Sequence, residues 1–361
     1  GTLPTLKIGE QTVRLEEIPG DNGEVRYQGD ITIASDEQTL QEGLLQFTIG
    51  GYADLAGNVG SDITETDGRV SGIEYDRTAP TYSKLGITNI THYYDGGDIT
   101  LAGKEDQIRI LVFFDEKLAV EPKVRILGKD NKVLKDNIAC AYSEETSNSQ
   151  NTNAYLANFN IKDELLNLPD GEEIKFEVYG YADAAGNVGT TLTNTEINYD
   201  PYLKVVYDET PPEFVKLGIA RNKDENDTRD QKYAKNGDSV RVLIYFNERL
   251  QVEPTVEMYG KTYTATYREL SSSPENNVYY YMADIDMTDD ITEGEIEFKI
   301  YGYSDAAGNV GIELDNEDIN NETYPKVIYD KTAPEISLKS EQYMEVEKRP
   351  EFVDWGLNIK D

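Results

Sequence analysis

The chain has 361 residues, with 34 Lys and Arg against 69 Asp and Glu, so its formal net charge is −35. A single Cys and a single His exclude an intrachain disulfide, a Cys-cluster metal site and a paired-His metal site. The acidic balance argues against binding to nucleic acid or to an anionic membrane, and no apolar run is long enough for direct membrane insertion. No basic-then-apolar leader opens the sequence, so we expect any signal peptide to lie outside it.

Self-similar segments indicate tandem repeats. One landmark occurs three times, as Gly51-Tyr-Ala-Asp-Leu-Ala-Gly-Asn-Val-Gly60, Gly180-Tyr-Ala-Asp-Ala-Ala-Gly-Asn-Val-Gly189 and Gly302-Tyr-Ser-Asp-Ala-Ala-Gly-Asn-Val-Gly311. A linker landmark follows each one, as Tyr75-Asp-Arg-Thr-Ala-Pro80, Tyr207-Asp-Glu-Thr-Pro-Pro212 and Tyr329-Asp-Lys-Thr-Ala-Pro334. These landmarks predict a partial repeat at 1–77, complete repeats at 78–208 and 209–330, and the start of a further repeat at 331–361. We therefore expect the chain to come from a longer tandem array.

Period-two alternation predicts strands along each repeat. In the second repeat we expect strands near Tyr82–Thr88, Gln107–Phe114, Pro122–Leu127, Asn137–Tyr142, Ala154–Ile161, Ile174–Val178 and Tyr202–Tyr207. The only helical turn expected is at Lys162–Leu168, because no stretch keeps a 3.6-residue period. About seven short strands per repeat without helices are typical of an immunoglobulin-like β-sandwich. The fold class predicted is therefore all-β, with tandem immunoglobulin-like β-sandwich domains in an elongated array.

Three features in fixed order are similar to those of bacterial immunoglobulin-like domains in large surface proteins. They are the Asp-x-Ala-Gly-Asn loop, the Asp-x-Thr-Ala/Pro-Pro linker, and the Phe-x-Glu-x-Leu turn of Phe114–Leu118 and Phe246–Leu250. The resemblance covers both complete repeats and most of the first. It implies an exported, extracellular cell-surface protein of the adhesin type whose repeats serve as stalk, spacer or adhesive modules. Some relatives bind Ca²⁺ between repeats. The extended segment between Asn187 and Tyr202 departs from the compact form of the family.

Acidic residues gather around the linkers, where they form a candidate Ca²⁺ site. Ca²⁺ takes six to eight oxygen ligands, mostly carboxylates and carbonyls. The candidate ligands are Asp54, Asn58, Asp76, Asp183, Asn187, Asp200, Asp208, Asp305, Asn309 and Asp330. Glu116 and Glu248 are weaker candidates, because a polar turn after a core strand accounts for them equally well. The alternative interpretation of the loop is a turn with its Gly at positive φ, and that of the acidic segments is a solvated, solubilising loop.

We expect no catalytic activity, since no nucleophile elbow, phosphate loop or triad pattern occurs. His92 is expected at the surface and Cys140 in the core. The function predicted is a structural spacer whose partners are the neighbouring repeats. One alternative is that the repeats bind carbohydrate or a host surface protein through the variable segments Lys129–Asn153 and Arg221–Asn236; another is an accessory region of a large secreted glycosidase.

Overall fold

The computed structural model describes residues 1–34, 39–68, 72–150, 152–162, 167–223, 227–269, 278–338 and 357–360. The chain divides into two compact units. The first unit comprises residues 1–87, 109–159 and 175–203, and the second comprises residues 88–108, 160–174 and 204–361. The division falls within the second predicted repeat, so the repeat boundaries given above stay a prediction.

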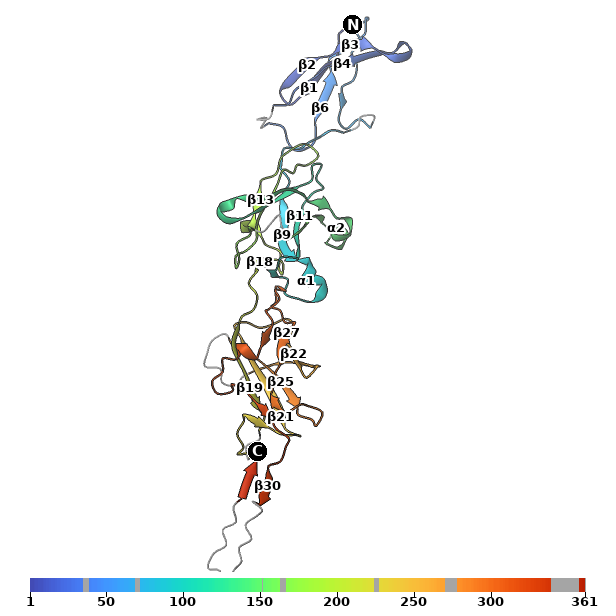
Figure 1. Cartoon of the computed structure of the whole chain (residues 1–361). Coiled ribbons are helices and arrows are strands. Elements are labelled where there is room, and N and C mark those ends of the chain that lie inside the picture. The colour runs from blue at the N-terminus through green and yellow to red at the C-terminus, as the bar shows by residue number, and fades with distance from the viewer. Residues whose placement is uncertain are drawn as a thin grey trace, which may run out of the picture. The chain divides into compact units, whose positions relative to one another are not determined.

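Antiparallel strands make up the first predicted repeat (Figure 1). The strands are β1 (Thr5–Ile8), β2 (Gln11–Arg14), β3 (Glu16–Pro19), β4 (Val25–Gln28), β5 (Gly43–Leu44), β6 (Phe47–Gly50), β7 (Ile63–Thr64) and β8 (Glu74–Tyr75). They form a sheet of order β2-β1-β6-β7 and the two-stranded pairs β3-β4 and β5-β8.

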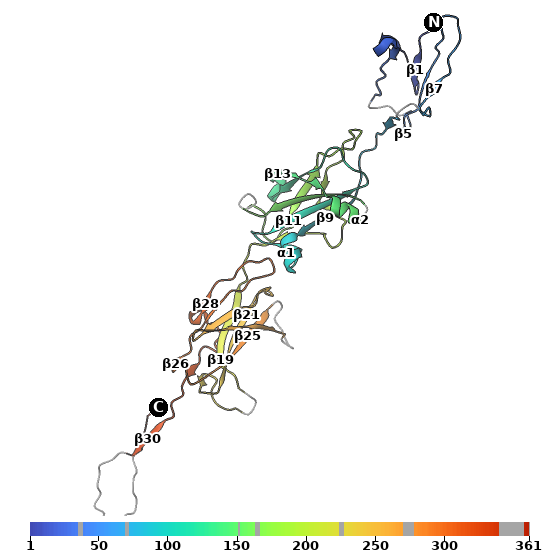
Figure 2. The same ribbon diagram turned by 90° about the vertical axis from the view of Figure 1, so that its right-hand side faces the viewer.

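The second repeat is built from two four-stranded sheets of order β14-β15-β11-β9 and β13-β12-β16-β17, with a parallel pair, β10-β18. Figure 2 shows β9 and β11 running side by side. The elements are β9 (Tyr82–Asn89), α1 (Ile90–Asp95), β10 (Leu101–Ala102), β11 (Gln107–Phe114), β12 (Lys123–Leu127), β13 (Val133–Ala139), β14 (Ala141–Tyr142), α2 (Glu144–Gln150), β15 (Asn153–Asn160), β16 (Lys175–Tyr179), β17 (Leu192–Thr193) and β18 (Val206–Tyr207).

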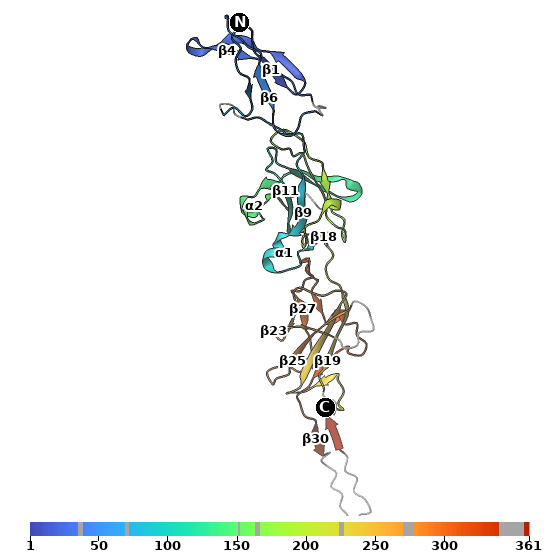
Figure 3. The ribbon, with the colours of Figure 1, turned by 180° about the vertical axis from the view of Figure 1, so that it is seen from behind.

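The third repeat keeps this arrangement, with sheets β19-β21-β25-β24 and β23-β22-β27-β28 and a smaller sheet, β20-β29-β26 (Figure 3). Its strands are β19 (Phe214–Arg221), β20 (Tyr233–Ala234), β21 (Ser239–Phe246), β22 (Thr255–Met258), β23 (Lys261–Thr264), β24 (Thr266–Arg268), β25 (Tyr279–Asp286), β26 (Gly294–Glu295), β27 (Lys299–Tyr301), β28 (Leu314–Asp315) and β29 (Ile328–Tyr329). A hairpin of β30 (Glu335–Leu338) and β31 (Leu357–Lys360) follows.

The alternating apolar residues of both repeats form their cores. Ile108, Ile110, Val112 and Phe114 on β11 are all fully buried, as are their counterparts Val240, Val242, Ile244 and Phe246 on β21. The ring of Phe246 packs against Tyr281 and Tyr303, with centroids 5.7 and 4.8 Å away. Phe114 meets Tyr155 and Tyr181 in the same way. The all-β, immunoglobulin-like sandwich predicted from the alternation is therefore confirmed.

Three local predictions differ from the structure. The repeats are not free of helices, because α1 and α2 are present. The strand expected over Asn137–Tyr142 is broken at Cys140, between β13 and β14. The strand expected over Tyr202–Tyr207 is confined to Val206–Tyr207, because Tyr202 closes a turn by donating its N–H to the Tyr199 carbonyl. Most of the helical turn expected at Lys162–Leu168 lies outside the described residues.

Candidate metal centres

The Asp-x-Ala-Gly-Asn loops are closed by their own Asp and Asn side chains. Asp305 accepts hydrogen bonds from the backbone N–H of Ala307 (2.9 Å) and Asn309 (2.8 Å), and from the Asn309 side-chain amide (2.9 Å). Asp54 and Asp183 make matching bonds to their own Asn residues. The intervening Gly308 has a φ of +86°, which favours glycine. The loop is thus the turn that its sequence indicates.

The Tyr and the last Gly of the same landmark pack together. The Tyr303 hydroxyl donates to the Ile312 carbonyl at 2.8 Å, which brings the ring over Gly311. A Cβ at Gly311 would overlap that ring, and the same holds for Gly189 beneath Tyr181. This close approach explains why a glycine ends each landmark, although its φ is not in the left-handed region.

The first junction brings a linker Asp to the loop of the following repeat. The Asn187 side-chain amide donates to the Asp76 carbonyl at 3.1 Å. One carboxylate oxygen each from Asp76, Glu116 and Asp183 lies within 4.8 Å of the others. Asp183 is 1% exposed, whereas the other two are half-buried. Three acids from a linker, a strand end and a loop therefore share one site inside the first unit.

Neighbouring negative charge perturbs this first site. Burial, followed by repulsion from Asp183, Asp115 and Asp76, raises the pKa of Glu116. For Asp183, burial works in the same direction, but the hydrogen bonds from Asn187 outweigh it and hold the pKa below its ordinary value. Asp183 is thus the fixed anion of the site, and Glu116 is the group whose ionisation is the most unfavourable.

The second junction repeats this arrangement inside the second unit. The Asn309 side-chain amide donates to the Asp208 carbonyl at 3.0 Å. Burial and repulsion from Asp305 and Asp208 raise the pKa of Glu248 to about 7. Burial also raises the pKa of Asp208, with a further contribution from Asp305. Since Asp305 is 1% exposed, the site again combines a buried loop Asp with a strand-end Glu and a linker Asp.

Not all of the predicted ligands join these two groups. Asp54 and Asn58 are exposed and bond within their own loop. Asp200 is exposed, immediately before Pro201. Asp330 is exposed and accepts the N–H of Thr332. Each complete site instead includes Glu116 or Glu248, which the sequence marks only as a polar residue after a core strand.

A second set of acids, which sequence reasoning missed, anchors the linkers. Asp170 accepts hydrogen bonds from the Glu209 N–H (2.8 Å) and the Thr210 hydroxyl (2.7 Å). Glu42 holds Thr78 and Glu293 holds Thr332 through equivalent bonds. The signal that would have found them is an acid followed by glycine ahead of a core strand, as in Glu42-Gly43, Asp170-Gly171 and Glu293-Gly294.

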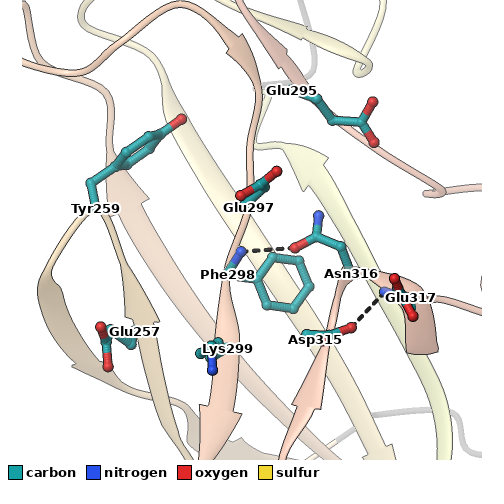
Figure 4. A pocket seen from close by; sticks show the side chains of 9 residues that line it. All are labelled: Glu257, Tyr259, Glu295, Glu297, Phe298, Lys299, Asp315, Asn316 and Glu317. Atoms are coloured by element: carbon teal, nitrogen blue, oxygen red, sulfur yellow. Dashed lines mark hydrogen bonds between the residues drawn. The ribbon is translucent and has the colours of Figure 1, made fainter.

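An acidic groove of about 480 Å³ lies on the third repeat (Figure 4). Its lining consists of Glu257, Tyr259, Glu295, Glu297, Phe298, Lys299, Asp315, Asn316 and Glu317. Asn316 accepts the Phe298 N–H at 2.8 Å, and Lys299 pairs with Glu313 at 2.6 Å. Asn316 thus fixes the strand behind the groove, and the exposed carboxylates give its rim a negative potential.

The two single residues differ in how they match expectation. His92 is not at the surface as predicted: it is 7% exposed, and its Nδ1 lies 2.8 Å from the Asp98 carbonyl. The prediction failed because α1 folds this loop back onto the domain. Cys140 is fully buried, as expected, and burial raises the pKa of its thiol. Within the described ranges, none of the helices has the length and apolar character needed to cross a bilayer.

Comparison with solved structures finds two distant likenesses. The chain is 11% identical to "Titin Ig tandem domains A164-A165", over 70% of this chain and 98% of that one, with a TM-score of 0.19. It is 5% identical to "Marsupial T cell receptor", over 64% of this chain and 98% of that one, with a TM-score of 0.20. No protein-family model and no curated protein matches the chain. Because TM-scores of this size carry no argument, the fold is assigned from the sheets above and the function from the junctions.

Proposed function

We propose that the chain is a run of structural spacer repeats of an exported bacterial cell-surface protein, and that Ca²⁺ at the repeat junctions stiffens the run. The observation that supports this proposal is the recurrence of one three-carboxylate arrangement at two linkers. Asp76 and Asp208 come from the linkers, Glu116 and Glu248 from strand ends, and Asp183 and Asp305 from buried loops.

The residues at each junction suit a hard divalent cation. Carboxylate oxygens are the ligands that Ca²⁺ prefers. Carboxylates this close repel one another when ionised, as the raised pKa of Glu116 and of Glu248 indicates. A bound Ca²⁺ supplies the missing positive charge. Asp76, Glu116 and Asp183 would hold it at the first junction, and Asp208, Glu248 and Asp305 at the second.

Such a cation would join two parts of the chain that otherwise meet through few contacts. The linker Asp precedes a Pro-containing segment, while the other two acids belong to the repeat that follows. Proline restricts itself and the residue before it, so Ala79-Pro80 and Pro211-Pro212 favour extended connections. The Thr78 and Thr210 hydroxyls, held by Glu42 and Asp170, fix the start of each linker. The role is mechanical: the repeats space or present a functional module rather than carry out a reaction.

Thermal unfolding with Ca²⁺ and with chelator tests the proposal. A ligand that binds only the native state stabilises it by RT ln(1 + [L]/Kd), which is about 2.7 kcal/mol at a hundredfold excess over Kd. We therefore expect millimolar Ca²⁺ to raise the melting temperature by several degrees relative to EDTA. Equal melting temperatures in the two conditions would rule out the Ca²⁺ clamp.

Two variants show where the ion binds. Asp305→Asn and Asp183→Asn each remove a buried carboxylate, and each is expected to abolish the Ca²⁺-dependent shift of its own junction. Glu105→Gln is the matched control, because Glu105 is exposed and lies 3.9 Å from Lys162. If the control lost as much of the shift as the junction variants, the effect would be general screening rather than binding.

A further inference from the structure

The third repeat carries a cavity of about 370 Å³ whose lining is basic, in a chain of net charge −35. Four cationic side chains line it: Lys223, Arg229, Lys232 and Lys326. Ligand pockets span roughly 300–1,000 Å³, so the cavity is large enough for one or two sugar rings. It lies in the variable segment Arg221–Asn236, apart from the junction site.

The wall of this cavity is held in place by a buried arginine. Arg221 is fully buried, and its guanidinium bonds Asp227 and the Arg229 carbonyl (3.0 Å). Arg229 in turn donates to both oxygens of Asp238, each at 2.9 Å. The loop before β20 is therefore fixed from inside the domain. A site that needs no reordering on binding loses less entropy when it is filled.

The charge available to a ligand comes from the lysines. Arg229 is matched by Asp227 and Asp238, whereas the only acid in the cavity lining is Asp230. Lys326 lies 3.5 Å from Glu295, a loose and exposed pair that contributes little. Three lysines around one cavity thus give it a local positive potential.

The remaining lining is polar and suits hydroxyl groups. Thr228, Gln231 and Thr323 offer hydroxyl and amide groups. Tyr324 supplies an aromatic ring, and that ring packs against the cluster of Ala220, Leu243 and Tyr280. The only aliphatic side chain of the lining is Ile219. An apolar ligand would gain little here, whereas a hydroxyl-rich anion matches both the charge and the polar groups.

The second repeat provides an internal comparison. Counting from the matched strands β9 and β19, β10 and β20, and β18 and β29, the four cations correspond to Thr91, Gly97, Thr100 and Lys204. Three of the four positive charges are thus present only in the third repeat. The cavity is not a general property of the sandwich.

We propose that this cavity of the third repeat binds an acidic sugar, one that bears a carboxylate on a hydroxylated ring. Lys223, Lys232 and Lys326 surround the carboxylate, and Thr323, Gln231 and the Tyr324 ring contact the rest of the ligand. The proposal stands independently of the Ca²⁺ clamp, since it uses none of the junction residues.

Isothermal titration calorimetry of the full chain with a uronic-acid disaccharide tests this assignment. We expect saturable binding that weakens as salt rises, and a loss of about 30-fold or more in affinity in the triple variant Lys223→Ala, Lys232→Ala, Lys326→Ala. These lysines are exposed, so the variant should fold, which an unchanged melting temperature verifies. Lys204→Ala, the counterpart of Lys326 in the second repeat, is the control and should change affinity less than twofold.

Four results would overturn the proposal. The first is no heat of binding at millimolar disaccharide, and the second is unchanged affinity in the triple variant. The third is equal binding of a neutral disaccharide of the same size, which would remove the role of charge. The fourth is equal or tighter binding of inorganic sulfate or of a tetraglutamate peptide, which would indicate a simple anion site or an acidic-peptide site instead.

Discussion

The second and third repeats agree at the end that meets the preceding linker and differ at the opposite end. At the first end both have a loop Asp, a strand-end Glu and a linker Asp. At the other end the second repeat buries Asn89, which donates to Asp106 at 2.8 Å, beneath the short helix α1. The third buries Arg221 in the same place, beneath a loop that carries further charges. The shared end is where the junction constrains the sequence, and the other end has been free to diversify.

The largest expected effect comes from the residue that makes the two repeats different. Arg221→Ala leaves Asp227 without one partner and opens a void in the core, so we expect a loss of about 3 to 5 kcal/mol. Asn89→Ala removes only neutral and singly charged hydrogen bonds, and should cost about 1 to 3 kcal/mol. Urea unfolding followed by peptide-resolved hydrogen exchange assigns each loss to its repeat. Equal losses would mean that the buried charge plays no special part.

The next effect should be the same in both repeats. Gly311→Ala and Gly189→Ala each force a Tyr ring away from its site, and overpacking of this kind costs up to about 3 kcal/mol. Gly308→Ala is the control: its Cβ would have free space around it, and only the positive φ is strained, at about 1 to 2 kcal/mol. Thermal melts rank the three variants. A larger loss for Gly308→Ala would contradict the close approach of Tyr303.

The smallest effect distinguishes the two junctions by pH. A carboxyl with a raised pKa in the folded state contributes stability below its unfolded pKa, and that stability is lost as pH rises through the folded value. For Glu248 the window runs from the ordinary pKa of 4.5 to about 7. Without metal, stability should therefore fall across this window by about 1 kcal/mol after allowance for solvent screening.

Glu248→Gln should remove that slope and raise stability in EDTA at pH 7, while reducing the gain from Ca²⁺. Glu116→Gln should do the same more weakly, since the pKa of Glu116 is raised for the same reasons at a more open site. The measurement is the melting temperature against pH with and without chelator. A variant that lost stability in EDTA would show that Glu248 is not strained by its neighbours.

Alternation along β11 and β21 made the sandwich predictable, because a period of two in β-branched and aromatic residues is typical of strands and does not place apolar residues on one face of a helix. The helix α1 was not predictable in this way. It spans only six residues, Ile90–Asp95, too few for a helical period, and its β-branched and aromatic residues are poor helix formers. Its only signals are the Asn89 cap and Gly96 at a φ of +84°.

The candidate site was half predictable for a similar reason. Linker and loop acids stand out because they recur in obvious landmarks. The partner of each linker Asp was not readable, since Asp208 and Asp305 are far apart in sequence and only the packing of one repeat on the next brings them together. Glu116 and Glu248 resemble ordinary turn residues until their surroundings are known. The basic cavity is assembled from segments on both sides of the domain and has no linear signature.

The bond between Asp170 and Thr210 determines how single repeats must be excised. The predicted boundary after Asp208 would separate Thr210 from the carboxylate that holds it, and would also cut next to the Asp208 N–H that donates to the Ala102 carbonyl. A self-sufficient second repeat must therefore extend through Thr210, and by the same reasoning a third must extend through Thr332. Each module thus keeps the first residues of its successor, so neighbouring modules overlap in sequence instead of abutting.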